Sequence, residues 1–234
     1  MFRQITLAAC GLSAVLATAA RAEGEPGVVV ELYTSQGCSS CPPADEFLAM
    51  LASDPRILPL ALHVDYWDYI GWADKFAQAQ FTDRQRAYAK AVGSRTIYTP
   101  QLIIGGADRI EGFAPEETAE RLRNHLKAGT SVRLTVTRVG DKLVIRAEAD
   151  PPLTETVRVQ LVRFKPEETV MIERGENAGK TITYHNIVTS WERIGDWGGQ
   201  EPLEVTVPFA GDEPGAVIVQ TAGPAAILAA ARVD

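Results

Sequence analysis

The stretch 33–45 constrains the fold most, because it places Cys38 and Cys41 between an apolar strand and the start of a helix. The preceding run, residues 28–34, is rich in β-branched and apolar side chains, which is typical of a strand buried on both faces of an α/β sheet. Pro42 disfavours a helical conformation at Cys41, so we expect a helix to begin at the proline. The two thiols are therefore predicted at a helix N-terminus.

A helix N-terminus changes the chemistry of a cysteine. Its unpaired backbone N–H groups and the positive end of the helix dipole stabilise a thiolate and lower the cysteine pKa. We expect Cys38, the outer sulfur, to be the nucleophile, and Cys41 to resolve a mixed disulfide by attacking Cys38. Asp45 and Glu46 add negative charge to the same turn, so the predicted activation is modest.

Residues 1–22 have the pattern of an export signal. Arg3 precedes an apolar stretch, residues 5–20, and the sequence Ala20-Arg21-Ala22 fits the small-x-small rule for cleavage. This pattern predicts a signal peptide and a periplasmic or secreted protein. An uncleaved anchor is the alternative, although the stretch is shorter than the roughly 20 residues that a membrane span needs. Later apolar segments are too short to span, so no membrane association is expected after cleavage.

Composition limits the choice of domains and partners. With 234 residues, 46% of them hydrophobic, the chain can bury one large core or two small ones; we expect two domains. The formal net charge is -7, and removal of the leader, which holds two arginines and no acid, makes it more negative. Such a surface repels nucleic acid and anionic lipid, so neither is expected as a partner.

The cysteine pair has three possible roles. Leader cleavage leaves Cys38 and Cys41, in a compartment where disulfides persist. A structural disulfide is one role, but a four-residue ring gains only about 2 kcal/mol in the chain-entropy model, against about 3 kcal/mol for a fifteen-residue loop. A structural zinc site needs four ligands, and the sequence has no second cysteine pair. A redox-active pair is therefore favoured over a structural disulfide or a metal site.

The segment after the first helix predicts a βαβ unit. Residues 57–65 form an apolar run that reads as a second strand, parallel to the first. The carboxyl ends of parallel strands meet at one edge, so His63 and the aromatic segment 66–72 are expected near the dithiol. That segment could grip an extended partner or simply cover a helix end. Residues 74–92 are expected to be helical.

The rest of the chain predicts two different kinds of structure. A strand entered through Pro100, a short hairpin partner at 109–112 and an amphipathic helix at 115–128 complete an α/β domain over residues 27–128. From residue 131 the apolar residues alternate, so residues 131–234 are predicted to form a smaller all-β, sandwich-like domain. In it, the polar loop 174–180 could contact the dithiol face or a ligand, but a plain hairpin turn is favoured.

The order of these elements resembles the thioredoxin fold over roughly residues 27–128. The resemblance depends on the strand, the Cys-x-x-Cys at a helix start, and a Thr99-Pro100 step followed by a hydrophobic strand and Gly105-Gly106. It implies that Pro100 is a cis-proline packed against the dithiol. It also implies that Thr99 offers its backbone to an extended protein partner by strand-like pairing.

The sequence is similar, more closely, to a bacterial family of secreted proteins known as domain of unknown function 1223. The similarity lies in residues 31–45, with Gly175-Glu176-Asn177 and His185-Asn186 further along. Membership would cover nearly the whole mature chain. It implies a fold and no established reaction.

The sequence also departs from thioredoxin. The residues between the cysteines are Ser39 and Ser40, without the Gly-Pro of a strong reductant or the histidine of strong oxidants, so the redox direction stays open. Glu31 lies near the position of the buried acid that exchanges a proton with the resolving cysteine in thioredoxins. We expect it to have that role here, while His63 is expected to be an ordinary core histidine.

These observations predict an exported thiol-disulfide oxidoreductase that acts on protein thiols or disulfides. Its site residues are Cys38, Cys41, Thr99, Pro100 and Glu31, and neither an organic cofactor nor a metal is implied. Two alternatives remain: a thioredoxin-fold binding module with a passive disulfide, and a copper-handling protein in which a histidine joins the two sulfurs. Enclosure of both sulfurs, or a proline distant from them, would argue against catalysis.

Overall fold

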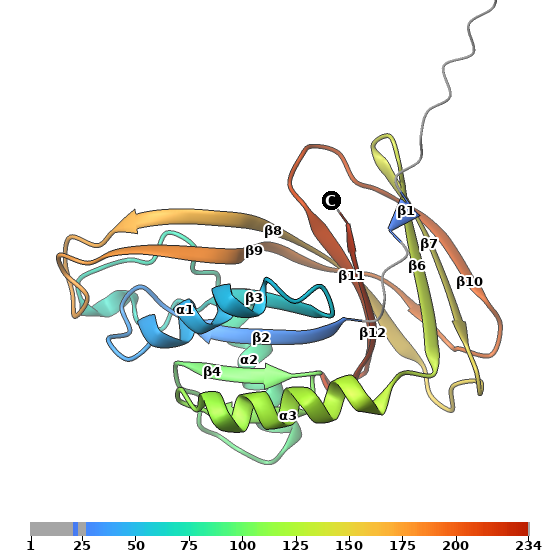
Figure 1. The fold of residues 1–234 in the computed structure, drawn as a ribbon, viewed down its shortest axis with the longest axis horizontal. Helices are drawn as coiled ribbons and strands as arrows, with labels where there is room; N and C mark the ends of the chain where they lie inside the picture. The colour runs from blue at the N-terminus through green and yellow to red at the C-terminus, as the bar shows by residue number, and fades with distance from the viewer. Residues whose placement is uncertain (1–20, 23–26, 234) are drawn as a thin grey trace, which may run out of the picture.

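The computed structural model describes residues 21–22 and 27–233 and is built from two sheets. An eight-stranded mixed sheet has the order β12-β11-β8-β9-β3-β2-β4-β5, and a four-stranded sheet has the order β1-β6-β7-β10 (Figure 1). The strands are β1 (Arg21–Ala22), β2 (Val28–Thr34), β3 (Ile57–His63), β4 (Gln101–Ile104), β5 (Asp108–Glu111), β6 (Val132–Val139), β7 (Lys142–Ala149), β8 (Val157–Met171), β9 (Thr181–Trp197), β10 (Leu203–Pro208), β11 (Gly215–Thr221) and β12 (Ile227–Val233). The helices are α1 (Pro42–Leu51), the short 3-10 helix η1 (Asp68–Ile70), α2 (Ala79–Ala91) and α3 (Pro115–Ala128).

Strand β2 is buried on both faces, as its composition predicts. Val30 and Leu32 pack on the side of α1 and α3, whereas Val29 and Tyr33 pack on the side of α2. This division follows from the two-residue period of a strand, which sends neighbouring side chains to opposite faces. Helices therefore cover both faces of this part of the sheet, with α1 and α3 on one face and α2 on the other (Figure 1).

Strands β2, β3, β4 and β5 position the cysteine loop. β3 runs parallel to β2, with Thr34 opposite His63 at the carboxyl ends, and α1 connects the two strands. β4 runs antiparallel to β2, with its first residue, Gln101, opposite Tyr33. The loop between β2 and α1 therefore leaves the sheet beside the segment that enters β4.

The C-terminal strands divide between the two sheets. β9 pairs in parallel with β3 through Ala61 and Ile187, which extends the large sheet into β8, β11 and β12. β6, β7 and β10 belong to the smaller sheet and pack on the β11–β12 side of the large one around a shared apolar core. The fold is thus mixed α/β. Strands that precede and strands that follow residues 129–130, where the sequence predicts a domain boundary, belong to the same large sheet.

Helix α2 is shorter than expected, because the prediction of helix from residue 74 is wrong. α2 begins at Ala79. The Asp74 carboxylate instead accepts hydrogen bonds from the backbone N–H groups of Gln36 and Phe76, and these contacts hold a turn at this point. A distant partner has overridden the local helical pattern.

The predicted leader falls mostly outside the described residues. Of residues 1–22, only Arg21 and Ala22 are described, and they form β1 against Val136 and Thr137 of β6. Among the described helices, none is both long enough and apolar enough to cross a membrane.

Candidate functional site

Cys38 and Cys41 form a disulfide at the start of α1. The helix begins at Pro42, as predicted, and Cys41 is its N-cap residue, although the backbone of Cys41 is helical, which the following proline is expected to disfavour. The Cys41 carbonyl accepts hydrogen bonds from the backbone N–H groups of Ala44 and Asp45, so Cys41 is already part of the first helical turn. The sulfur pair therefore lies at a helix N-terminus, where a thiolate is stabilised.

The disulfide is covered in this oxidised state, which is the enclosure of both sulfurs that argues against catalysis. Cys38 is 2% exposed and Cys41 0% exposed. The two residues between them, Ser39 and Ser40, are exposed, and the Ser40 hydroxyl lies 3.4 Å from the Cys38 sulfur. Of the four residues in the disulfide ring, only Ser39 and Ser40 therefore face solvent.

Asn177, at the tip of the β8–β9 hairpin, closes over the cysteine loop. Its side-chain N–H group donates hydrogen bonds to the backbone carbonyls of Gln36 and Cys38, both at 2.9 Å. Lys180 donates to the Asn177 side-chain oxygen at 2.8 Å and so orients the amide. Asn177 is buried, although its immediate neighbours in the loop are exposed. The interpretation of loop 174–180 as a plain turn is therefore wrong.

Two tryptophans from the predicted aromatic segment contact the cysteine loop and the segment that enters β4. The Trp72 indole donates to the Gln36 side-chain oxygen at 2.8 Å. The Trp67 indole donates to the Thr99 hydroxyl at 2.7 Å, and a Cβ on Gly37 would lie only 3.2 Å from the Trp67 Cβ. These two side chains hold the site in place through their hydrogen bonds. Tyr69 of the same segment, in contrast, is 82% exposed.

The Thr99–Pro100 step lies beside the loop that precedes the cysteines. The peptide bond is cis, and Pro100 is buried. The β2–β4 pairing ends with Tyr33 opposite Gln101, so Pro100 and Thr99 come next to the residues that follow Tyr33. Trp67 contacts both Thr99, through a hydrogen bond, and Gly37, the residue directly before Cys38, through close packing.

Glu31 lies on the face of the sheet opposite α1 and is not brought to the disulfide. Its carboxylate binds the Arg84 guanidinium through two hydrogen bonds of 2.8 Å, and it accepts further hydrogen bonds from the hydroxyls of Tyr33 and Tyr88. Burial would lower the pKa of Arg84, but the Glu31 carboxylate outweighs it and raises that pKa. Glu31 thus forms a buried ion pair with Arg84 that connects β2 to α2.

A second set of polar residues lies on the α1 face of the sheet. His63, at the end of β3, is 0% exposed, and its Nδ1 lies 2.7 Å from the Asp74 carboxylate. Burial would raise the pKa of Asp74, but His63 and the backbone N–H groups of Gln36 and Phe76 lower it overall. An ionised carboxylate only accepts, so Nδ1 carries the proton in this pair.

Asp45, which the sequence identifies only as a negative charge in the first turn of α1, is a buried residue. It is 4% exposed, on the buried side of α1 with Ala44 and Leu48, rather than at the surface. Burial raises its pKa to about 7, an effect that His63 partly offsets. Its position three residues before Leu48, on the apolar side of the helix, is a signal from which its burial could have been predicted.

The described residues contain no group of three or more His, Cys, Asp or Glu side chains arranged to hold a metal ion. The copper interpretation would add His63 to the two sulfurs. In the described state the sulfurs are bonded to each other and the His63 Nδ1 is bonded to Asp74. That interpretation stays a prediction.

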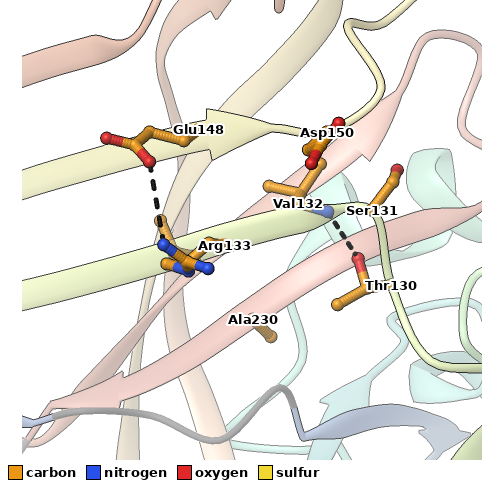
Figure 2. Close-up of a pocket in the computed structure, with 8 residues that line it drawn as sticks. Thr130, Ser131, Val132, Arg133, Glu148, Asp150 and Ala230 are labelled. Carbon is orange, nitrogen blue, oxygen red and sulfur yellow. Dashed lines mark hydrogen bonds and ion pairs between the residues drawn. The ribbon is translucent and has the colours of Figure 1, made fainter.

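A separate pocket of about 490 Å³ lies at the strand-rich end of the molecule. Figure 2 shows it between β6, β7 and β12, with the Arg133–Glu148 ion pair at its edge. None of the residues that line it belongs to the predicted site. It is therefore distinct from the disulfide and its surroundings.

The sequence matches the model of one protein family. The family described as "Protein of unknown function (DUF1223)" matches residues 29–220. The chain belongs to this family. Residues 29–220 include the cysteine loop, the Thr99–Pro100 step and the Asn177 hairpin, so the whole site lies within the family match.

Two solved structures are similar to the chain. An X-ray crystal structure of a protein from Agrobacterium tumefaciens is 34% identical, with a TM-score of 0.77, over 88% of this chain and 93% of that one. HBP35 of Porphyromonas gingivalis is 13% identical, with a TM-score of 0.65, over 88% of this chain and 74% of that one. The second likeness concerns the fold alone. A comparison with curated proteins found no match.

Proposed function

We propose that the protein is an exported thiol-disulfide oxidoreductase, with a thioredoxin-like arrangement around its disulfide, that exchanges disulfides with partner proteins. The observation that carries the proposal is the placement of the Cys38–Cys41 disulfide at the N-terminus of α1. A ring of four residues adds little stability in the chain-entropy model. The helix N-terminus, in contrast, stabilises the thiolate that exchange requires.

Each cysteine has its own step. A partner thiolate attacks the Cys38 sulfur, the Cys38–Cys41 bond breaks, and Cys41 leaves as a thiolate. In the opposite direction, Cys41 attacks the Cys38 sulfur of the mixed disulfide and the partner leaves as a thiolate. Cys38 suits the outer role because exposed serines follow it, while Cys41 is part of the first helical turn. The partner gains or loses two electrons accordingly.

The Thr99–Pro100 step supplies the platform for the partner chain. Trp67 holds the Thr99 hydroxyl, and the Thr99 backbone would serve as the edge beside the cysteine loop. An extended segment of the partner would pair with this edge as an added strand. Partner binding and sulfur exchange would then occur on adjacent segments.

Burial of the disulfide means that exchange requires the covering hairpin to move. Asn177 is held to the cysteine loop by two hydrogen bonds from one amide group. Hydrogen bonds of this kind contribute only about 1 kcal/mol each to stability. Local opening of the hairpin tip is therefore a small step compared with unfolding.

The same burial favours a second candidate, a binding module in which the disulfide is passive. Cys38 and Cys41 are almost fully covered, and a disulfide that no partner reaches cannot exchange. In that case the long β8–β9 hairpin and the aromatic segment would make the contacts. The two candidates differ in whether a covalent partner can be trapped.

A trapping experiment in the native host tests the proposal. Cys41→Ala removes the resolving sulfur and should leave a partner protein covalently bound to Cys38. Cys38→Ala is the matched control and should trap nothing. A reduction potential above about -250 mV agrees with exchange, whereas a value below about -300 mV describes a disulfide that resists reduction. If no partner is trapped and the potential lies below about -300 mV, the oxidoreductase proposal is wrong and the binding module with a passive disulfide is supported.

A further inference from the structure

Buried polar atoms without hydrogen-bond partners are concentrated next to the disulfide. In the described ranges 21–22 and 27–233, these atoms include both carboxylate oxygens of Asp45, Nε2 of His63, Oγ1 of Thr34 and Nε2 of Gln36. Buried polar groups in proteins are normally paired, and each exception needs an explanation, of which a catalytic or redox role is one. Four residues of one small region therefore carry unused hydrogen-bonding capacity.

Asp45 and Cys41 lie on the same side of α1. Asp45 follows Cys41 by four residues, and its backbone N–H donates to the Cys41 carbonyl at 3.1 Å. Cys41 itself has helical backbone angles, φ -78° and ψ -34°. Side chains four residues apart on a helix are neighbours, with Cβ atoms about 5–6 Å apart. The Asp45 carboxyl is therefore the acid on the same buried helix face as the Cys41 thiol, one turn away.

The elements that pack against α1 place polar and titratable groups around Asp45, and these groups affect the pKa of its carboxyl. Thr34 ends β2, and His63 ends the adjacent β3. Asp74 holds the Nδ1 side of the His63 ring, so the Nε2 side is the one left without a partner. From β9, Tyr184 packs its ring against His63, with centroids 4.9 Å apart. Burial, Asp45 and Asp74 together raise the Tyr184 pKa, so this residue stays neutral beside the carboxyl.

We propose that Asp45 accepts the proton of the Cys41 thiol when Cys41 attacks the mixed disulfide, and returns it when Cys41 leaves in the opposite direction. This inference rests on the proposed exchange function. The Cys41 S–H proton moves to the Asp45 carboxylate, the resulting thiolate forms the bond to Cys38, and the partner sulfur leaves with the electron pair of the broken bond. The partner disulfide is the oxidant, and the protein dithiol is the reductant.

The acid–base properties of the two groups match this transfer. Burial raises the pKa of Asp45 to about 7, which is close to the ordinary value of about 8.5 for a cysteine thiol. A proton acceptor works best when its pKa lies near the working pH. His63 lowers the Asp45 pKa, so it weakens the hold of the Asp45 carboxyl on this proton.

The resolving step can be followed with the aromatic disulfide dithiobis(nitrobenzoate). Attack by Cys38 of the reduced protein releases one coloured thiolate, and attack by Cys41 releases a second one in a separate phase. With Asp45→Asn, we expect the second phase to slow at least tenfold near pH 7, because the loss of the proton acceptor outweighs the larger thiolate fraction of Cys41, and to lose its inflection around the Asp45 pKa. The matched control is Glu46→Gln, which removes the same charge from an exposed neighbour in the same turn and should leave both phases unchanged.

A thiol titration tests the same inference without any exchange. In a Cys38→Ser background, the ultraviolet absorbance of the thiolate reports the ionisation of Cys41. An ionised Asp45 nearby disfavours a second negative charge, so Asp45→Asn should raise the dissociation constant of the Cys41 thiol at least tenfold. Glu46→Gln should produce a much smaller change.

A third measurement uses the unsubstituted protein, so that it does not depend on how a variant folds. The carbon NMR signal of the Asp45 carboxyl should titrate at different midpoints in the oxidised and reduced states, because coupled groups titrate together. Equal midpoints, together with an unchanged Cys41 titration in Asp45→Asn, would overturn the proton-transfer role. A protein that shows this coupling but traps no partner would instead lose the exchange function while keeping the proton pair.

Discussion

Asn177 holds the backbone carbonyl of Cys38 although the two residues are 139 positions apart in the sequence. The contact exists because β8 and β9 form a long hairpin whose strands begin and end in the apolar core shared with the smaller sheet. The tip of the hairpin extends to the N-terminus of α1 (Figure 1). The C-terminal half of the chain therefore covers the disulfide that the N-terminal half carries.

The first prediction concerns this cover. Asn177→Ala removes two hydrogen bonds to the cysteine loop, each worth about 0.5–1.5 kcal/mol. If these bonds control access, reduction of the disulfide by dithiothreitol should become roughly tenfold faster, since about 1.4 kcal/mol corresponds to a factor of ten. The rate is measured by labelling the released thiols and quenching at intervals.

Asn186→Gly is the control for this experiment. Asn186 is also buried on β9, and its side chain donates to the Pro59 carbonyl, away from the cysteine loop. Glycine tolerates its positive φ of 47°. This control should leave the rate of reduction unchanged, and equal rates in both variants would mean that the hairpin tip does not limit access.

The second prediction concerns the stability that the disulfide provides. The chain-entropy model gives a four-residue ring about 2 kcal/mol, so the Cys38→Ala/Cys41→Ala protein should lose no more than this in free energy of unfolding. Urea denaturation of the oxidised protein and of the double variant measures the difference. A loss of about 5 kcal/mol would instead make the disulfide a structural element of the core.

Local features of the sequence were sufficient to predict most helices and strands near the site. Pro42 begins α1 and Pro115 begins α3, as predicted, because proline suits the first turn of a helix. Gly105 and Gly106 adopt positive φ angles in the turn between β4 and β5, which a β-branched residue would resist. These signals act within a few residues and do not depend on the rest of the fold.

The parts that could not be predicted depend on distant contacts. The spacing of Asp45 from Leu48 indicates the buried side of α1, but nothing adjacent to it in the sequence reveals that β2, β3 and β9 enclose it. Asn177 lies in a loop of polar residues that has the composition of an ordinary turn. Glu31 reads as a candidate acid until Arg84 is found to bind it from α2. In each case the partner is more than 10 residues away, so no local pattern contains it.

The third prediction separates the structural role of Glu31 from the chemistry of the disulfide. Glu31→Gln leaves the buried Arg84 guanidinium without its carboxylate, and breaking a buried ion pair typically costs about 3–5 kcal/mol. The free energy of unfolding should fall by this amount, while the thiol exchange rate of the remaining folded protein stays unchanged. Glu204→Gln, which breaks the exposed pair with Arg146, should leave stability close to that of the unsubstituted protein. A change in the pH profile of exchange in Glu31→Gln would restore Glu31 as the proton-transfer residue.

The fourth prediction concerns stability as a function of pH. Burial raises the pKa of Asp45 from its ordinary value of 3.8 to about 7, so the folded protein holds this proton at pH values where the unfolded chain has lost it. The stabilisation is complete below the unfolded pKa and is lost as pH rises through about 7. The difference between the two pKa values corresponds to about 4 kcal/mol.

Asp45→Asn cannot ionise and should escape this loss. Relative to the unsubstituted protein, the variant should therefore gain stability as pH rises from about 4 to about 8, by up to about 4 kcal/mol. Urea denaturation of both oxidised proteins at several pH values measures this difference, and it cancels the contributions of Asp74 and the other shared groups. Glu46→Gln, on the exposed side of the same turn, should show a much smaller dependence. Parallel pH profiles for Asp45→Asn and the unsubstituted protein would mean that Asp45 is solvated in solution and has an ordinary pKa, because only a carboxyl that stays enclosed can hold its proton to neutral pH.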